Sequence, residues 1–490
     1  MKLKTLLTVS VCACALQLRA QETNSMQQFQ QRLDAMQLNF ERVVAAQRAE
    51  IDSLKQQVTA MRAAPPRPLL AETSAVSSAA PSIASKPWSP SDPIRVGKGA
   101  AYMDVGMVAT FAAGGSTAND LEALQAGGHD PNQRGFTVQG VELNLQGAVD
   151  PYFRGNANLL FQVDGGGESL VELEEAWLES VSLPGNLQVR AGQLLTDFGR
   201  VNTQHPHSWS FVDAPLVNAR LLGGDGLRNP GARLSWLVPT PFYSELFFGV
   251  QNSHGETAHS FRNEHEDAPF LGRVNRARRV TTFSDLLYSA RYAAAFDVSD
   301  TLTLLGGLSA AFGANSSGKD TGTQIYGVDT FWKWKPTNAH GGFPFVSWQS
   351  EAMLRRYEAG AYSNDFDGST TLDAGEDVFG DGLIHNAPRE TLTDWGFYSQ
   401  LAWGFRPGWV TGLRGEYVGR ASTANYEQLY GDDAERLGRW RVSPNLTWYP
   451  SEFSKLRLQY NYDNRANIGV DHSLWLQFEF LLGAHAAHKF

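Results

Sequence analysis

Cysteine is almost absent from this chain of 490 residues, and its two copies, Cys12 and Cys14, both lie near the N-terminus. They fall within an apolar run over residues 6–16 that follows two lysines, a pattern typical of a secretory signal peptide, which we expect to span residues 1–20. A lipoprotein signal is the alternative, because a cysteine follows a small residue in this run. Cleavage after Ala20 would leave no thiol, which excludes disulfides, thiolate catalysis and cysteine-ligated metals.

Long hydrophobic runs and an excess of basic charge are also missing. No stretch after residue 20 approaches the roughly 18 apolar residues that a membrane-spanning helix needs. The 51 acidic residues outnumber the 41 basic ones, which argues against a nucleic-acid partner. The sequence has no GxSxG, HExxH or P-loop pattern, so we expect neither an enzyme nor a cofactor. An exported chain of this kind is either soluble in the periplasm or crosses a membrane as a closed β-barrel.

Two segments after the signal differ sharply in composition. Residues 26–62 contain no glycine or proline, and their apolar residues recur at steps of three and four. This periodicity predicts a helix with one apolar stripe, and within residues 21–63 we expect a periplasmic coiled coil of about five heptads. A helix lying on its own barrel is the alternative. Residues 64–94 hold seven prolines among alanines and serines, which predicts a semi-extended linker.

From residue 95 to residue 490, apolar and polar residues alternate with period two. In residues 153–164, for example, the odd positions are Phe, Gly, Ala, Leu, Phe and Val, and the even positions are mainly polar. This pattern predicts strands with one apolar face. The sixteen strands that we expect cover residues 101–113, 136–149, 153–164, 170–183, 187–196, 231–239, 243–253, 286–298, 302–314, 323–335, 343–358, 394–406, 409–421, 439–449, 453–463 and 471–482.

The connections between these strands favour a barrel over a sandwich. Seven short turns alternate strictly with eight connections that are mostly longer. Outer-membrane barrels have short periplasmic turns and long external loops, whereas a sandwich has no reason for this asymmetry. Tryptophan and tyrosine also cluster near the expected strand ends, as in the aromatic girdles of membrane interfaces. We therefore predict an all-β transmembrane antiparallel β-barrel of about 16 strands in a bacterial outer membrane, with both termini in the periplasm.

The sixteen strands, the N-terminal periplasmic extension and the final aromatic residue, Phe490, together resemble the phosphate-selective porin O/P superfamily. The resemblance covers about residues 95–490 and is architectural rather than motif-level. It implies passive diffusion of small ionic solutes, anionic or phosphate-like, and recognition of the terminal phenylalanine by the outer-membrane assembly machinery. A homotrimer surrounded by outer-membrane lipid and lipopolysaccharide is the expected assembly, and four arginines within residues 273–279 lie where lipopolysaccharide phosphates could pair with them.

In such porins the third external loop folds inward and narrows the pore, and here that loop is residues 196–231. It is too apolar for a free loop, so we expect it to pack against the barrel. Because charges at a constriction set selectivity, we expect its site residues to be Arg200, Arg220, Arg228, Asp213, Asp225 and Trp209. Strand parity gives the wall eleven basic and eleven acidic lumen-facing residues, and this balance departs from a basic ladder tuned for phosphate.

Histidines form a second candidate site. His205 and His207 lie in the constriction loop, and His254, His259 and His265 lie in the next long loop. Imidazole and neighbouring carboxylates suit zinc, so a porin related to divalent metals is one alternative function, although loop histidines are often simply solvated. The other alternative is a structural anchor, in which the coiled coil and linker connect a plugged barrel to the cell wall and thus to peptidoglycan.

Overall fold

The computed structural model describes residues 94–98, 101–148, 150–262, 269–274, 279–365, 368–369, 371–372 and 376–483. The signal peptide, the coiled coil and nearly all of the linker lie outside the described residues, as do His265 and Phe490, and the expectations for them stay predictions. Over the ranges described, no helix has the length and apolar character needed to cross a bilayer.

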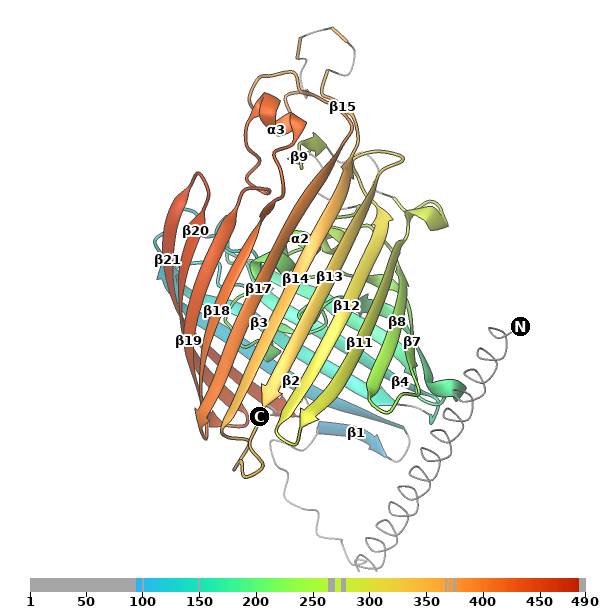
Figure 1. Cartoon of the computed structure of the whole chain (residues 1–490), viewed down its shortest axis with the longest axis vertical. Helices are drawn as coiled ribbons and strands as arrows, with labels where there is room; N and C mark the ends of the chain where they lie inside the picture. The colour runs from blue at the N-terminus through green and yellow to red at the C-terminus, as the bar shows by residue number, and fades with distance from the viewer. Residues whose placement is uncertain are drawn as a thin grey trace, which may run out of the picture. The chain divides into compact units, whose positions relative to one another are not determined.

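Most of the described chain is β-strand, and the strands form a barrel (Figure 1). Seventeen strands join in one sheet, and sixteen of them close into an antiparallel ring because β2 pairs with β3 on one edge and with β21 on the other. This confirms the predicted barrel. The ring consists of β2 (Ala101–Ser116), β3 (Gly135–Ala148), β4 (Phe153–Val163), β5 (Ser169–Ser180), β6 (Leu187–Leu195), β7 (Arg228–Leu237), β8 (Tyr243–Gln251), β11 (Leu287–Ser299), β12 (Leu302–Ala314), β13 (Gly322–Trp334), β14 (Phe345–Ala359), β17 (Glu390–Arg406), β18 (Trp409–Arg420), β19 (Arg439–Ser451), β20 (Ser454–Arg465) and β21 (Gly469–Gly483).

The seventeenth strand, β1 (Ile94–Lys98), is one that the alternation pattern did not predict. It pairs with residues 101–105 of β2, on the edge that β21 occupies from Gly106 onward. β1 therefore covers a short stretch of β2 backbone that would otherwise be an open edge at the seam of the ring. The last residue of the predicted linker, Ile94, is thus already part of the sheet.

Side chains along the ring strands alternate between a polar inside and an apolar outside. In β21, Leu474, Leu476 and Phe478 point outward and are 53%, 45% and 44% exposed. Gln477 and Glu479, on the other face of the same strand, are 2% and 0% exposed. A protein in water would place these two classes the other way round. An apolar outer surface and a polar lumen suit a barrel surrounded by lipid.

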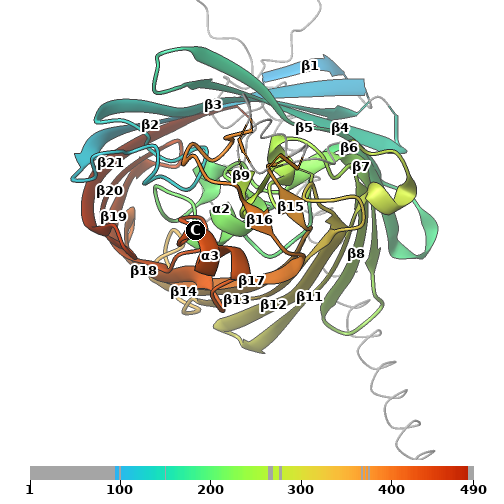
Figure 2. The same cartoon turned by 90° about the horizontal axis from the view of Figure 1, so that it is seen from above.

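The long connections lie at one end of the ring, and several of them fold into it (Figures 1 and 2). The connection from β6 to β7, residues 196–227, is called the constriction loop below; it ends four residues earlier than expected because β7 begins at Arg228. Its helix α2 (Leu216–Leu222) lies inside the ring (Figure 2). The remaining short elements are η1 (Pro184–Asn186), η2 (Pro206–Ser208), η3 (Glu256–Ala258), β9 (Pro269–Phe270), β10 (Arg273–Val274), η4 (Phe283–Asp285), β15 (Tyr362–Ser363), β16 (Asn386–Ala387) and α3 (Asn425–Tyr430).

Candidate functional site at the constriction loop

The constriction loop is fastened to the wall of β18, β19 and β20 through Asp213, a fully buried residue. Its carboxylate pairs with Arg414 and, at 3.2 Å, with Arg441. It also accepts hydrogen bonds from the amides of Gln459 at 2.9 Å and Asn461 at 2.7 Å. Burial alone would raise the pKa of Asp213, but Arg441 and Arg414 lower it to about 2. The carboxylate is therefore ionised at neutral pH and holds the loop against a basic part of the wall.

Apolar side chains of the loop form a core with the wall of β11, β12, β13, β14 and β17. Trp209 packs against its margin, and the buried members are Phe198, Val201, Val217, Leu221, Leu222, Leu227, Ala258, Phe261, Leu287, Ala311, Ile325, Met353 and Tyr398. Gly199 permits a close approach to the same wall, since its φ is +59° and an added Cβ would lie 1.6 Å from Oε1 of Glu351. Its N–H donates to Oγ of Ser309 at 3.0 Å. The loop is thus a packed part of the lumen, as its apolar composition predicted.

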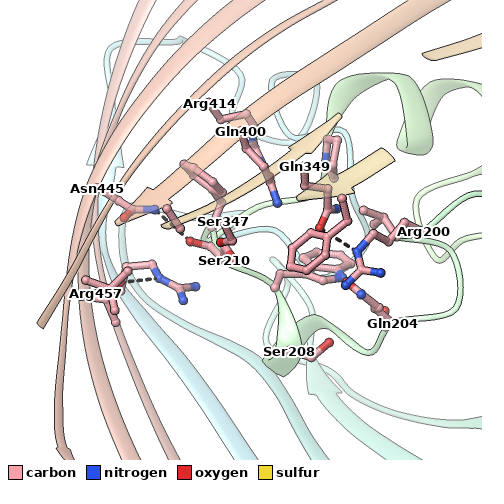
Figure 3. Close-up of a pocket in the computed structure, with 18 of the residues that line it drawn as sticks. Arg200, Gln204, Ser208, Ser210, Ser347, Gln349, Gln400, Arg414, Asn445 and Arg457 are labelled. Atoms are coloured by element: carbon pink, nitrogen blue, oxygen red, sulfur yellow. Dashed lines mark hydrogen bonds between the residues drawn. The ribbon is translucent and has the colours of Figure 1, made fainter. Parts of the chain in front are cut away.

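Cavities remain on both sides of the loop. A cavity of about 450 Å³ lies between the loop and the short-turn ends of β13, β14, β19 and β20 (Figure 3), and one of about 320 Å³ lies among the long connections. A small cavity of about 30 Å³, called the neck below, shares Val201, Gln204 and Trp209 with the first and Ala219 and Gly224 with the second. The neck holds about as much volume as one water molecule occupies in the liquid, roughly 30 Å³. The neck therefore lies between the two larger cavities, one on each side of the loop.

The cavity on the short-turn side is lined by five lysine and arginine side chains and by one carboxylate, that of Asp213. Arg414 and Lys455 are neutralised by buried acidic partners. Arg200 instead donates to Gln349 at 3.0 Å (Figure 3), Arg457 donates to neutral side chains of β19 and β21, and Lys333 lies 5.8 Å from the ring centre of Phe345. Among the residues that the structure describes, none of these last three cations forms an ion pair. The cavity therefore carries excess positive charge.

The predicted constriction residues occupy different parts of the loop. Arg200 and Trp209 line the larger cavity, and Asp213 anchors the loop beside it. Arg220 lines the cavity among the long connections, where burial lowers its pKa to about 10 and its guanidinium donates to the carbonyl of Leu437 at 2.7 Å.

The other two predicted charges lie elsewhere. Asp225 lines the neck, 3.7 Å from Nε2 of His129. Arg228 lines none of the three cavities: it is the first residue of β7, is 1% exposed and pairs with Glu172 on β5. Because Arg228 begins a strand instead of lying in the loop, its side chain pairs with a glutamate of the wall and does not face a cavity.

The structure separates the four candidate histidines that it describes, His205, His207, His254 and His259. His205 and His207 flank Pro206 at the start of η2. The imidazole of His205 reaches glutamates on β3 and β5, and that of His207 reaches Glu142 on β3. The ring centres of His259 and Phe270 lie 4.7 Å apart, and His259 lines the cavity among the long connections. The backbone of His254 forms an isolated β-bridge with Arg262 in the same loop. Of the candidate histidines that the structure describes, only His205 and His207 therefore share a site.

Strict alternation along β5 would place Glu175, one of the glutamates around His205, on the lipid-facing side of the strand. In β5, residues 173 and 175 pair with adjacent residues of β4, so Glu174 is the extra residue of a β-bulge. Glu174 and Glu175 both become buried in the lumen, and Glu179 beyond them pairs with arginines there. A usable signal was present, because a strict alternation would have placed the charge of Glu175 among lipid-facing residues, where it is costly.

Comparisons with solved structures give barrels of low sequence identity. The outer membrane channel DcaP of Acinetobacter baumannii has 14% identity and a TM-score of 0.47, covering 78% of this chain and 97% of that one. Pseudomonas putida OprB has 10% identity and a TM-score of 0.46, with 78% and 94% covered. An anion-selective porin from Comamonas acidovorans has 9% identity and a TM-score of 0.45, with 78% and 100% covered.

The strand pairing itself defines the class of structure to which the chain belongs: a closed sixteen-stranded antiparallel barrel in which the connection between the fifth and sixth ring strands folds inward. By sequence, it belongs to the same family as an uncharacterized protein of Aquifex aeolicus (strain VF5). The two are 30% identical over 421 residues, which cover 79% of this chain and 80% of the relative. No family model matches the sequence.

Proposed function

We propose that this protein is an outer-membrane porin through which small solutes diffuse passively, with a preference for anions. Lipid and lipopolysaccharide surround the barrel, and the protein works as a homotrimer with its N-terminus in the periplasm. The apolar outer face and the polar lumen support the membrane location. The observation that carries the proposal is that cavities lie on both sides of the constriction loop and that the neck shares lining residues with each of them, because a barrel that serves only as an anchor has no need of such space in its lumen.

The anion preference rests on the unpaired cations of the larger cavity. A paired arginine contributes little net potential to a passing ion, because its carboxylate partner lies within a few ångströms and cancels most of the field. Arg200, Lys333 and Arg457 have no such partner among the described residues, so their charge acts on ions in the cavity. The volume of the neck limits permeation to small solutes, and the cations of the larger cavity favour inorganic anions among them. Phosphate, which the resemblance to the O/P superfamily implies, is one member of this class.

Planar-bilayer recordings test the proposal. The purified protein should insert as channels of small, steady conductance, and in a potassium chloride gradient the reversal potential should have the sign expected for chloride permeation. The triple variant Arg200→Glu, Lys333→Glu and Arg457→Glu should shift this potential toward cation selectivity, while far-ultraviolet circular dichroism and heat-dependent gel mobility report an intact barrel. Unchanged selectivity in that variant would refute the assignment of these cations. Arg228 is left out because its replacement would break the pair with Glu172.

A second function is favoured by the neck itself. Its volume of about 30 Å³ and the apolar core beside it are also what a plugged barrel would have. In that case the coiled coil and linker would tie the outer membrane to peptidoglycan, and the barrel would serve as the anchor. The same bilayer experiment separates the two functions, because a plugged barrel gives no steady single-channel current.

A further inference from the structure

A cluster of imidazoles and carboxylates lies where the constriction loop meets β3 and β5. Nδ1 of His205 lies 2.9 Å from Oε2 of Glu174 and 3.6 Å from Oε2 of Glu142. Nδ1 of His207 lies 3.1 Å from the other oxygen of Glu142. The ligand-type atoms of Glu142, Glu174 and His205 all lie within 4.8 Å of one another. Three different elements therefore bring nitrogen and oxygen donors to one point.

The spacing of these donors fits a small divalent metal ion. Zinc binds imidazole nitrogen and carboxylate oxygen at about 2.0–2.2 Å, so two ligands of a tetrahedral site lie about 3.3–3.6 Å apart. The separations of 2.9 and 3.6 Å around His205 Nδ1 bracket this range. Side-chain movements of a few tenths of an ångström would place an ion among the three donors, and His207 lies close enough to Glu142 to offer a fourth.

The charge of the cluster also calls for a cation. Glu174 and Glu175 are 4% and 8% exposed, and among the described residues their ion pairs are with imidazoles, never with arginine or lysine. Burying carboxylates without a full counter-charge is expensive. Elsewhere in the lumen, arginine side chains of the wall pair with buried carboxylates, as Arg414 and Arg441 do with Asp213. A divalent ion would supply the missing charge here.

His205 is held in an orientation suited to a metal ligand. Its Nε2 atom lies 3.1 Å from Oε2 of Glu175 and 2.8 Å from Nδ2 of Asn158. In the metal-bound form the Glu175 carboxylate would accept the Nε2 proton and the Asn158 amide would turn its oxygen toward Nε2, which leaves the lone pair of Nδ1 directed toward Glu174 and Glu142; metal-binding histidines commonly have such a second partner. The β-bulge at Glu174 makes this possible, because it turns Glu174 and Glu175 to the same side of β5.

We propose that His205, Glu174 and Glu142 bind one divalent transition-metal ion, with Zn²⁺ as the reference ion, and that Glu175 positions His205. The ion would tie the constriction loop to β3 and β5 beside the neck, which Glu174 also lines. The site does not depend on the proposed anion permeation, since a plugged barrel could hold the same ion.

Metal titration of the full chain tests the site. The protein, carrying no polyhistidine tag, is treated with a chelator and titrated with Zn²⁺ in detergent micelles, and it should bind one ion per chain. Co²⁺ in its place should give the visible absorption bands of a four- or five-coordinate ion. His205→Ala and Glu174→Gln should each weaken binding at least tenfold. Glu175→Gln should keep the stoichiometry but weaken binding about 10- to 100-fold, as loss of a positioning partner does.

The matched control is His472→Ala, since His472 lies on the exposed face of β21 and contacts Tyr460. It should bind Zn²⁺ as the wild type does. Absence of stoichiometric binding to the wild type, or equal binding by His205→Ala and Glu174→Gln with the barrel intact, would overturn the proposal. Bilayer conductance measured in chelator reports pore function separately. In a conducting protein, micromolar Zn²⁺ should lower the current, and His205→Ala with His207→Ala should remove this response.

Discussion

Reversing one charge in the larger cavity gives a quantitative test of how the lumen selects ions. Lys333 is suited to this because it lines the cavity, lies at the short-turn end of β13 and has no ion pair among the described residues. Lys333→Glu therefore changes the charge that a passing ion meets without leaving a buried carboxylate unpaired. We expect the variant to keep its fold and to lose much of its preference for chloride.

The size of the effect follows from the size of the cavity. A sphere of 450 Å³ has a radius of about 4.8 Å, so a charged group in its wall lies about 6 Å from an ion at the centre. At that distance two unit charges in water interact by about 0.7 kcal/mol, and screening at 0.1 M salt leaves about 0.4 kcal/mol. Changing +1 to −1 disfavours an anion by about 0.8 kcal/mol and favours a cation equally. The chloride-to-potassium permeability ratio should fall roughly tenfold.

The measurement is the reversal potential in a potassium chloride gradient, compared among the wild type, Lys333→Glu and Lys335→Glu. Lys335 is the matched control because it has the same chemistry two residues away but does not line the cavity. Its replacement should change the permeability ratio much less, and the difference between the variants should shrink at 1 M salt, where screening is stronger. Equal shifts in both variants, or no shift in either, would refute the reasoning that this cavity lies in the ion path.

Three further predictions concern the constriction loop, Asp130 of the β2–β3 connection, which accepts a hydrogen bond from the backbone of Ala214 in that loop, and the N-terminal segment. Asp213→Asn breaks buried pairs with Arg414 and Arg441, so it should destabilise the folded barrel by about 3–5 kcal/mol, seen as a lower temperature of gel-mobility change, and should raise conductance. Burial and the nearby charge of Asp213 raise the pKa of Asp130 to about 7, above its unfolded value of about 3.9. Protonated Asp130 thus contributes its full stability below about pH 4, and this contribution is lost as the pH rises to 7. In Asp130→Asn the unfolding temperature should therefore depend less on pH between about pH 4 and pH 7. A pH dependence equal to that of the wild type would contradict this. Deletion of residues 26–62 should reduce cross-linked trimers while leaving conducting pores, and trimers of undiminished yield would exclude a trimerising coiled coil.

The strands could be predicted from the sequence because each one faces two very different surroundings. For β12, residues 302–314, both predicted ends agree with the observed ones, because lipid on one side and the lumen on the other impose alternation along the whole strand. The same rule misled where the backbone departs from regular pairing. The bulge at Glu174 reverses the parity of the following residues, and the alternation pattern itself does not show where an extra residue is inserted; the charge of Glu175 on the lipid-facing side was the one signal of it.

The sequence pointed to the loop that holds the candidate site but not to the partners of its residues. Connection length and apolar composition pointed to the constriction loop, and the spacing of His205 and His207 marked a candidate metal site. Their glutamate partners lie 30 or more positions away on β3 and β5, and Asp213 meets Arg414 across 201 positions. Such contacts depend on how the loop folds into the ring, which local patterns do not encode.

Electrostatics accounts for the direction in which the loop crosses the lumen. Its acidic residue, Asp213, meets the arginines of β18 and β19, and its imidazole residue, His205, meets the glutamates of β3 and β5. The opposite docking would set Asp213 against carboxylates and leave Arg414 and Arg441 sharing the single carboxylate of Glu416, and the loss of a buried charge's partner costs several kcal/mol. The two contacts also differ in how they can be controlled. An arginine–aspartate pair offers no nitrogen lone pair to a metal ion, whereas an imidazole–carboxylate contact can bind one. Regulation of the neck would therefore act at the β3–β5 side, while the Asp213 side keeps the loop in place.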